Sequence, residues 1–423
     1  MAASRPSKEP DLIAQVARLA RGQLAAPQAA LAEAFAGLYY GGTDPLELAE
    51  RDAGDLAGAA AAHLDLGRRR AGDAPKLHVY NPRLETHGWQ STHTVAQIVG
   101  EDMPFLVDSA TMEINRQGLA LHLVVHPVMR VARDAKGRLQ SVAAPAASKD
   151  GGLESFMHLE LDRQTDPVRL REIEQGLARV LGDVRATVED WQPMQERLRG
   201  LIAELDATQL PLGAEEVAEA CAFLAWLLDN HMTLLGYRDY DLVREGGEDV
   251  LRVVKGSGLG ILREGEATTV STSFATLPPE TRARARLPEL LVLSKANARA
   301  TVHRPGYLDY VGVKRFDAEG RVSGERRLLG LYTHTVYTAN PGAIPVLRRK
   351  VAQVQARAGF LPASHDGKAL ASILEDYPRD ELMQIEPGEL YAHAIAILRL
   401  GQRQRTRLLV RRDAYGRFVT CLL

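Results

Sequence analysis

The run DMPFLVDSATMEINRQGLALHLVVHPVMRV, residues 102–131, decides the fold of the first half of this chain of 423 residues. Its first part has a helical pattern, because apolar residues from Met103 to Ile114 recur at intervals of three and four. Asp102 is predicted to cap this helix at its N-terminus, and Gly118 is predicted to end it. A helix is therefore expected between these two residues.

The second part of the same run has the periodicity of a strand. Every odd position from Leu119 to Val131 is apolar, whereas His122, His126 and Arg130 share the even face. Successive side chains of a strand point to opposite faces of a sheet. The sequence therefore predicts a strand with one buried face, directly after the helix.

The flanking sequence completes a compact α+β unit. A strand pattern begins at Thr92, and a further strand is expected over Ser155–Leu161. Asp166-Pro167 starts a helical stripe through Val180, and Asp183–Val188 is interpreted as a last strand. The resulting order βαββαβ is that of a ferredoxin-like sandwich, in which two helices cover one face of the sheet.

The rest of the chain alternates between helical and strand-rich regions. Residues 1–90 are Ala- and Arg-rich and predict helices, and residues 193–230 predict two more helices. Strand patterns dominate from Thr233 to Tyr337. Helices are then expected over residues 344–360, 368–377 and 390–400, and two short strands close the sequence.

A short repeat marks three predicted hairpins. The pattern D-A-x-G-R occurs in Arg133–Arg138, Phe316–Arg321 and Arg412–Arg417, each time between two strand-like runs. Asp begins such turns by accepting a backbone N–H two residues on, and Gly supplies a positive φ. Convergent turn chemistry and internal duplication both explain the repeat.

Composition limits the classes of function. The formal net charge is −2, with 45% hydrophobic and 25% charged residues, so no global positive field favours nucleic acid or anionic lipid. No apolar run is long enough to span a membrane. Cys221 and Cys421 are too few for a disulfide framework, and Met1–Pro10 lacks the apolar core of a signal peptide. We therefore expect a cytoplasmic protein without nucleic-acid or membrane partners.

Motifs that suggest chemistry have simpler explanations. The glycines of Lys255–Leu262 lack the sixth-place glycine of a dinucleotide fingerprint. His122 and His126 would lie about 13 Å apart on a strand, too far to share a metal. Ser364 or Asp366 is expected to cap a helix rather than to belong to a catalytic triad. No catalytic, cofactor or metal site is predicted from the residues alone.

A basic stretch near the end of the sequence has two further interpretations. Residues 399–407, continued by Arg411 and Arg412, could contact phosphate. Aromatic residues are sparse there, which favours a solvated face or a domain contact.

Several long runs resemble the N-terminal region of the large bacterial NAD-specific glutamate dehydrogenases. These runs are EDMPFLVDSATME (101–113), LHLVVHPV (121–128), ESFMHLELD (154–162), LLGYRDYD (234–241), SGLGIL (257–262), ATVHRP (300–305), YVGVKRFD (310–317), GERRLLGLY (324–332), SHDGKAL (364–370) and YPRDEL (377–382). The resemblance covers nearly everything from about residue 90 onward.

The resemblance implies a domain plan for the chain. In that plan the βαββαβ unit is an ACT-type domain and the central β-rich region is PAS-like. The segments are a helical N-terminal lead-in (1–90), the ACT-type domain (91–190), a helical connector (191–231), the PAS-like domain (232–340), a second helical connector (341–400) and the first hairpin of a truncated second ACT-type domain (401–423).

The resemblance also implies a function. The chain would be the N-terminal regulatory and oligomerisation segment of an enzyme that converts glutamate and NAD to 2-oxoglutarate, ammonium and NADH. It would be a piece of a homo-oligomeric protein whose catalytic lysines and NAD-binding fold lie beyond Leu423, with no cofactor in this segment. A stand-alone ACT- and PAS-type amino-acid sensor or interaction protein is the alternative.

One loop is the candidate effector site that the resemblance implies. ACT domains that bind amino acids often carry D-x-P-G-L-L before the first helix, where glycine lets the ligand approach backbone N–H groups. This sequence has Asp102, Met103 and Pro104 but Phe105 at the glycine position. The ring is expected to fill the space of the ligand carboxylate. An amino-acid effector at these four residues, or a domain that serves only subunit contacts, are the two hypotheses.

Overall fold

The computed structural model describes residues 9–22, 28–147, 149–263, 269–400, 406–413 and 419–422. The chain divides into two compact units, of which the first comprises Met1–Arg185 with Thr301–Arg304 and the second comprises Ala186–Ala300 with Pro305–Leu423. The boundary between the units falls within one helix, α7 (Pro167–Glu189).

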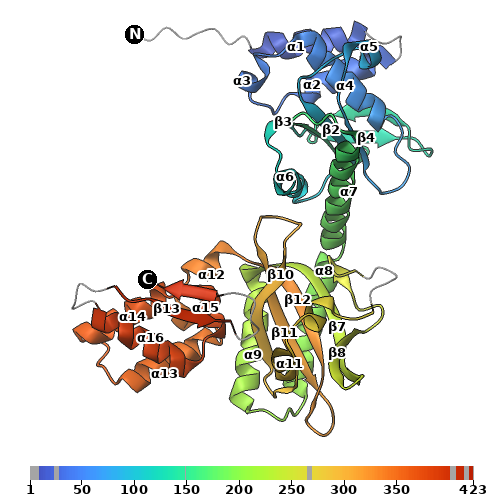
Figure 1. Ribbon diagram of the computed structural model, residues 1–423. Helices are drawn as coiled ribbons and strands as arrows, with labels where there is room; N and C mark the ends of the chain where they lie inside the picture. Colours follow the sequence, from blue (N-terminus) through green and yellow to red (C-terminus); the bar gives the residue numbers. More distant parts are fainter. Residues whose placement is uncertain are drawn as a thin grey trace, which may run out of the picture. The chain divides into compact units, whose positions relative to one another are not determined.

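The first unit combines six strands with seven helices in its described residues (Figure 1). In chain order its elements are α1 (Glu9–Gly22), α2 (Gln28–Tyr39), α3 (Pro45–Leu48), α4 (Ala53–Gly67), β1 (Lys76–Tyr80), α5 (Leu84–His87), β2 (Thr94–Glu101), α6 (Leu106–Arg116), β3 (Leu121–Val125), β4 (Val128–Arg133), β5 (Leu139–Ala143), β6 (Gly152–Leu161) and α7.

Local sequence signals start two of the N-terminal helices. The Asp44 side chain accepts the backbone N–H of Leu46 at 2.9 Å, and Pro45 opens α3. Asp52 accepts the N–H of Gly54 at 2.8 Å and so caps α4. These carboxylates satisfy donors that a helix N-terminus leaves without an intrahelical partner.

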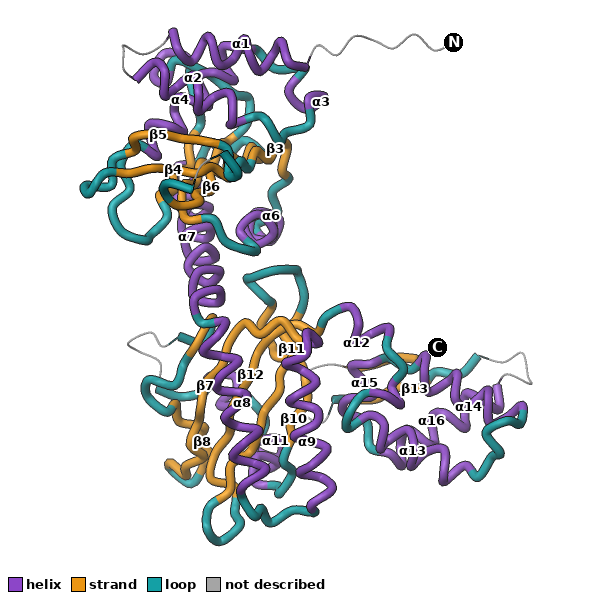
Figure 2. Tube along the Cα trace, turned by 180° about the vertical axis from the view of Figure 1, so that it is seen from behind, coloured by secondary structure: helices purple, strands orange, loops and turns teal. Residues whose placement is uncertain are grey.

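The sheet of the first unit is antiparallel in every pairing. Its strand order is β1-β2-β6-β4-β5, and β3 also pairs with β6. Figures 1 and 2 show α1, α2 and α4 on one face of this sheet, and α6 and α7 on the other. The unit is therefore a three-layer arrangement, with helices on both faces of the sheet rather than on one.

Three sequence predictions for this unit are wrong in detail. Residues 183–188 are helical, because Ile173, Leu177, Val180, Val184 and Thr187 continue one buried stripe along α7. The edge position beside β2 is instead taken by β1, which lies in the region predicted to be helical. The predicted strand from Leu119 to Val131 is interrupted between β3 and β4, where Pro127 follows Val125 and His126.

The alternation of that strand is nevertheless confirmed. Leu123, Val125, Met129 and Val131 are buried and pack with the N-terminal helices. Phe156 of β6 lies fully buried in the same cluster, with its ring 4.9 Å from that of Phe35 in α2. The N-terminal helices thus share a core with the sheet.

The second unit joins a large sheet to a helical module. In chain order its elements are α8 (Trp191–Ala207), α9 (Ala214–Trp226), η1 (Leu227–His231), β7 (Met232–Glu245), β8 (Glu248–Val253), β9 (Leu259–Gly260), α10 (Thr272–Ala275), α11 (Pro279–Ala283), η2 (Arg284–Arg286), β10 (Leu291–Arg299), β11 (Tyr307–Phe316), β12 (Val322–Tyr332), α12 (His334–Thr338), η3 (Pro341–Ala343), α13 (Leu347–Ala358), α14 (His365–Asp376), α15 (Arg379–Gln384), α16 (Pro387–Leu400), β13 (Leu409–Arg412) and β14 (Val419–Leu422).

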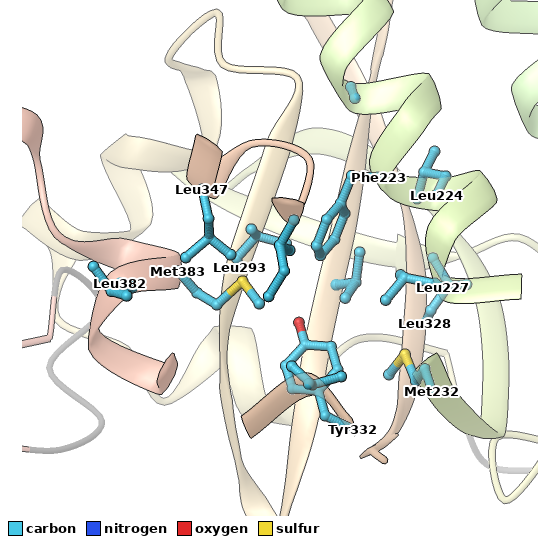
Figure 3. Close-up of a cluster of buried hydrophobic side chains, with 14 of the residues drawn as sticks. Phe223, Leu224, Leu227, Met232, Leu293, Leu328, Tyr332, Leu347, Leu382 and Met383 are labelled. Atoms are coloured by element: carbon cyan, nitrogen blue, oxygen red, sulfur yellow. The ribbon is translucent and has the colours of Figure 1, made fainter. Parts of the chain in front are cut away.

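The sheet of the second unit has the order β10-β11-β12-β7-β8, with β9 beside β7. Its pairings are antiparallel, and its strands lie in the region where the sequence predicts strands, from Thr233 to Tyr337. Figure 3 shows how one core joins the sheet to helices, with Phe223 between Leu293 and Leu328, and with Met383 beside Leu293. Helices α9 and α15 therefore pack into a continuous apolar cluster with the strands.

Two of the three predicted turns are confirmed. Asp134 accepts the backbone N–H of Lys136 at 2.8 Å between β4 and β5, and Gly137 has φ +74°. In the same way Asp317 accepts the N–H of Glu319 between β11 and β12, with Gly320 at φ +76°. The third occurrence, Arg412–Arg417, lies largely outside the described residues.

The hairpin β13–β14 is held by buried charge. Arg411 is 8% exposed, and its guanidinium pairs with Glu381 of α15 at 2.9 Å and with Glu389 of α16 at 3.1 Å. Thr420 donates to the same Glu381 carboxylate. The contact of Arg411 with other elements of its unit is confirmed, whereas residues 401–405 of the basic stretch lie outside the described part of the chain.

Candidate functional site

The loop predicted to bind an effector lies between β2 and α6 in the first unit. Asp102 donates its backbone N–H to the carbonyl of Leu153 at 3.0 Å and so extends the sheet. The prediction that Asp102 caps the helix is wrong, because the N-cap residue is Phe105 and no side chain accepts a hydrogen bond there. Gly118, with φ +75°, ends the helix as predicted.

Phe105 has a backbone conformation that suits glycine. Its φ is +73°, in the left-handed region that costs a residue with a Cβ about 1–2 kcal/mol. The resemblance had placed the glycine of amino-acid-binding loops at this position. The backbone at position 105 therefore has the conformation that such a glycine would adopt, although the residue at this position has a large side chain.

The Phe105 side chain contacts a distant part of the sequence. Its ring lies 4.9 Å from that of His303, measured between centroids, and His303 donates its backbone N–H to the Ser109 hydroxyl of α6 at 3.2 Å. His303 also has a positive φ, of +80°. Both residues belong to the first unit, where they bring the Thr301–Arg304 segment against the start of α6.

The space beside this loop is small. A cavity of about 20 Å³ lies against Met103 and Leu106, with Ile98, Met157 and Leu181 among its other neighbours. That volume holds about one water molecule. The four residues Asp102–Phe105 stay a predicted effector site, but an amino acid requires more space than this cavity offers.

At position 105 a glycine variant should be more stable than an alanine variant, which is the reverse of the usual order. Both substitutions remove the ring, but only alanine keeps the strain of a positive φ. We expect Phe105→Gly to be more stable to urea than Phe105→Ala by about 1 kcal/mol, although glycine is normally the costlier residue in the folded chain. Equal stabilities, or a more stable alanine variant, would show that the positive φ stores no strain.

A second group of polar residues lies where α3, α4, β3 and β6 approach one another. Glu160 of β6 is 4% exposed, yet it is the centre of a charged cluster. Its carboxylate accepts from Arg51 at 2.6 Å, lies 3.1 Å from Nδ1 of His93, and lies 3.5 Å from Nε2 of His158. A carboxylate buried to this degree is stable only when it is paired in this way.

The pairing controls the protonation of this carboxylate. Burial by itself raises the pKa of Glu160, but the hydrogen bonds and charges of His158 and Arg51 outweigh burial and lower the pKa to about 2. Glu160 is therefore ionised throughout the physiological range.

The cluster opens onto a large cavity. The cavity has a volume of about 700 Å³ and is lined by the cluster and by acidic residues of α3 and α4. His122, which the sequence singled out, stacks its ring 4.3 Å from that of His93 and pairs with Asp162 at 2.8 Å.

The sequence analysis did not identify Arg51, Glu160 or His158 as candidate site residues. The one available signal was the polar pair His158 and Glu160 inside the apolar strand FMHLEL.

The other sequence candidates have structural roles. His126 bonds to the Ser155 hydroxyl at 2.7 Å, away from His122. Ser364 accepts the N–H of Gly367 and caps α14 as predicted. In the described residues no group of three or more His, Cys, Asp or Glu side chains is placed to hold a metal ion. Among those residues no helix is both long and apolar enough to cross a membrane.

The glycine-rich loop of the second unit is bonded to Asp190. Asp190, between α7 and α8, accepts the backbone N–H of Gly260 at 2.7 Å. The same carboxylate accepts two bonds from the guanidinium of Arg263 at 2.7 and 2.9 Å. Gly260 has φ +60°, and a Cβ there would lie 2.1 Å from the Leu235 carbonyl oxygen. This contact explains a glycine at position 260 without any nucleotide.

A buried arginine and a half-buried lysine in the second unit also act in packing. The guanidinium of Arg327 lies 4.1 Å from the ring centre of Tyr240 and donates to Ser271 at 2.9 Å. Lys350 lines a cavity of about 590 Å³, but its ammonium donates to the carbonyls of Leu382 and Met383 at the end of α15. Burial lowers the pKa of Lys350 to about 8. Both cations are held by neighbouring protein groups.

Comparison with known proteins gives a consistent result for most of the chain. Residues 35–177 match the family described as Glutamate dehydrogenase, ACT1 domain, and residues 344–403 match the family described as Glutamate dehydrogenase, helical motif 1. The first match begins within α2 and includes α4 and the whole sheet of the first unit. The second covers α13 to α16.

Three relatives share the same name, NAD-specific glutamate dehydrogenase. The chain is 40% identical to the protein of Halomonas elongata over 415 residues, which is 98% of the chain and 26% of that relative. It is 40% identical to the protein of Pseudomonas aeruginosa over 402 residues, 95% of the chain and 25% of the relative. The identity to the protein of Mycobacterium tuberculosis is 29% over 372 residues, 86% of the chain and 21% of the relative. The chain thus spans about a quarter of the length of these relatives.

Proposed function

Because the chain belongs to the family of the NAD-specific glutamate dehydrogenases, we propose that it is a regulatory and oligomerisation segment of such an enzyme. The whole enzyme would oxidise glutamate to 2-oxoglutarate and ammonium in the cytoplasm and reduce NAD to NADH. In this proposal the reacting groups and the NAD site belong to other parts of a homo-oligomeric protein.

One observation carries this proposal. The similarity runs over 98% of the chain, and the two segments that match named families are an ACT domain and a helical motif. The buried charges described above support it further, because Glu160, Asp190 and Arg327 are each held by neighbouring protein groups. Each of these groups has a structural role that requires no substrate.

The architecture of the second unit supports the finer assignments within the proposal. An antiparallel sheet with helix α9 packed on it is what a PAS-like domain requires. The hairpin β13–β14 would be the beginning of a second ACT-type domain, since a two-stranded sheet is marginal alone. Regulation through these domains requires an effector that binds two conformations of the enzyme with different affinity.

A direct assay tests whether the catalytic groups lie outside this chain. The purified chain, mixed with glutamate and NAD, should produce no NADH absorbance above a control without protein. A longer enzyme that contains this segment should turn over under the same conditions. Turnover by the chain alone would contradict the proposal, because it would place the catalytic groups within these residues.

The alternative is an amino-acid sensor or interaction protein that acts without a dehydrogenase. The cavity beside Glu160 is compatible with it, because binding a ligand requires no catalytic domain. The two functions differ in what binding does. An effector of an enzyme segment changes the glutamate-dependent rate of the longer enzyme, whereas the ligand of a separate sensor leaves that rate unchanged.

A further inference from the structure

Lys350 of α13 is held by neutral groups. Its Nζ donates to the carbonyl oxygens of Leu382 at 3.0 Å and Met383 at 2.9 Å, and among the described residues no carboxylate forms an ion pair with it. Lys295, by contrast, pairs with the buried Asp309 at 2.5 Å. A lysine bound only to carbonyls can lose its proton without leaving a buried carboxylate unpaired. Lys350 is therefore able to become a free amine within the folded unit.

The Lys350 side chain also borders an open space. It is half-buried and lines the cavity of about 590 Å³. Figure 3 shows Leu293 of β10 close to Leu347 of α13 and Met383 of α15, and both Leu293 and Met383 belong to the cavity wall. The wall is therefore partly apolar. Lys314 borders a cavity of only about 20 Å³, so a small molecule has room beside Lys350 but not beside Lys314.

The surroundings of Lys350 favour the neutral amine. Burial lowers its pKa, Glu386 before α16 raises it, and Arg411 of β13 lowers it, with a net value of about 8. The carboxylate of Glu219 in α9, across the cavity, is engaged by Arg348. The other charged residues of the cavity wall are Glu215, Glu216, Arg284, Glu289 and Arg349. A neutral amine is the nucleophilic form of lysine, and burial is one of the ways in which proteins produce it.

Two arginines in the same wall are suited to an anionic group. Arg349 pairs with Glu215 at 3.1 Å, and Arg284 lies 3.8 Å from Glu289. The two carboxylate side chains are 79% and 44% exposed, and ion pairs with exposed carboxylates are weak. Guanidinium groups bind phosphate through paired N–H donors. A phosphate in the cavity can therefore compete for both arginines.

We propose that Lys350 is a site of acylation, at which its amine accepts the acyl group of a small acyl phosphate. The neutral Nζ attacks the carbonyl carbon and forms a C–N bond, while the bond between that carbon and the phosphate oxygen breaks. Inorganic phosphate leaves with the electron pair and takes up the proton that the amine loses. The product amide is uncharged and keeps one N–H, so the end of α15 loses its cation. This inference goes beyond the proposed function and does not depend on it.

Acetyl phosphate and mass spectrometry test the site. The 423-residue chain is incubated with an excess of acetyl phosphate at pH 7.5, and the acetylation of each lysine is followed over time. At this pH an amine with a pKa of about 8 is about one quarter neutral, whereas an ordinary lysine with a pKa of about 10.4 is neutral to about one part in a thousand. The less basic amine is intrinsically the weaker nucleophile. We therefore expect Lys350 to react about tenfold faster than the exposed Lys368 of α14.

The pH dependence and the unfolded chain are the controls for this preference. The rate at Lys350 should level off above about pH 8, whereas the rate at Lys368 should continue to rise. In urea that unfolds the chain the preference should disappear, because the cavity and the burial are lost. A rate at Lys350 no higher than that at Lys368 in the folded chain overturns the proposal. A preference that persists in the unfolded chain also overturns it, because it would come from the local sequence.

A double variant tests the role of the two arginines. Arg284→Gln/Arg349→Gln should slow the reaction of Lys350 with acetyl phosphate at least about threefold and leave Lys368 unchanged. The neutral N-hydroxysuccinimide ester of acetic acid is the matched donor, and its reaction with Lys350 should change less. Circular dichroism melting checks that the variant is folded. An equal loss with both donors, or no loss with acetyl phosphate, would overturn the assignment of the phosphate to these arginines.

Discussion

Replacing Glu154 with alanine should lower the free energy of unfolding of the first unit by about 3–5 kcal/mol. Glu154 of β6 is 3% exposed and pairs with Arg133 at 2.6 Å and with Arg70 at 3.0 Å. Arg133 also donates to the carbonyls of Gly67, at the end of α4, and Gly137, in the β4–β5 turn. Removing the carboxylate leaves two largely buried guanidinium groups without their counter-ion.

The measurement needs a signal from the first unit alone. Trp89 lies in this unit, and the other two tryptophans, Trp191 and Trp226, lie in the second. Urea unfolding followed by fluorescence in a Trp191→Phe/Trp226→Phe background reports on Trp89. Glu172→Ala is the control, since the Glu172 carboxylate is 54% exposed in its pair with Arg169, and its loss should change stability by about 0.5 kcal/mol or less. Equal effects of the two substitutions would contradict the role given to burial.

The role of Arg133 illustrates what the sequence could and could not predict. The D-A-x-G-R pattern predicts the turn correctly, because Asp134 and Gly137 act within a few residues of each other. The pairing of Arg133 with Glu154 and its bond to Gly67 join residues 21 and 66 positions apart. Such pairings depend on how the strands assemble, which a local pattern does not encode.

The wrong predictions have similar causes. Residues 183–188 contain Val184, Thr187 and Val188, which favour a strand locally, but the buried stripe of α7 continues through Val184 and Thr187. Packing at helical spacing overrides the local preference. The strand β1 was missed for a different reason, since an edge strand of five residues acquires its identity from pairing with β2.

The candidate sites were predictable to different degrees. The loop at Phe105 could be located by resemblance, and its positive φ agrees with the glycine that the resemblance places there. Arg51 lies just before α4, and Glu160 lies 109 residues later, on β6. Their ion pair therefore exists only in the folded unit. Local patterns therefore identify turns and caps, whereas sites built from distant elements require the structure.

The first unit should also lose stability in mild acid, and His63 is the main reason. His63 of α4 is completely buried, with Nδ1 accepting from the Tyr39 hydroxyl at 2.6 Å and Nε2 donating to the Ile98 carbonyl at 3.1 Å. Burial, together with the charge of His158, lowers the pKa of His63 to about 3, although its bond to Ile98 opposes this. The folded chain therefore keeps His63 neutral far below the usual pKa of about 6.5.

The direction of the pH effect follows from proton uptake. Between pH 6.5 and 3 the unfolded chain binds a proton at His63 that the folded chain does not bind. Each such group lowers the free energy of unfolding by about 1.4 kcal/mol for every pH unit of acidification. Below pH 4.5 Glu160 adds a second contribution of the same sign, because its folded pKa of about 2 lies below its unfolded value of 4.5. The loss should therefore steepen below that pH.

His63→Gln isolates the first contribution. Glutamine stays uncharged at every pH and keeps one donor and one acceptor in the buried space. Between pH 6.5 and 4.5 we expect the slope of stability against pH to be smaller than in the parent chain by about 1.4 kcal/mol per pH unit. His78 and His126, whose pKa values burial also lowers, retain their share of the slope in both proteins.

The same tryptophan background and urea titrations at several pH values measure these slopes. His365→Gln is the control, because His365 lies in α14 of the second unit, on which the Trp89 signal does not report. The Glu160 contribution should persist in the His63→Gln chain and appear only below pH 4.5. If the His63→Gln chain has the same slope as the parent chain, the explanation is contradicted. His63 would then bind a proton in the folded unit, and its hydrogen bonds from Tyr39 and to Ile98 would have to rearrange.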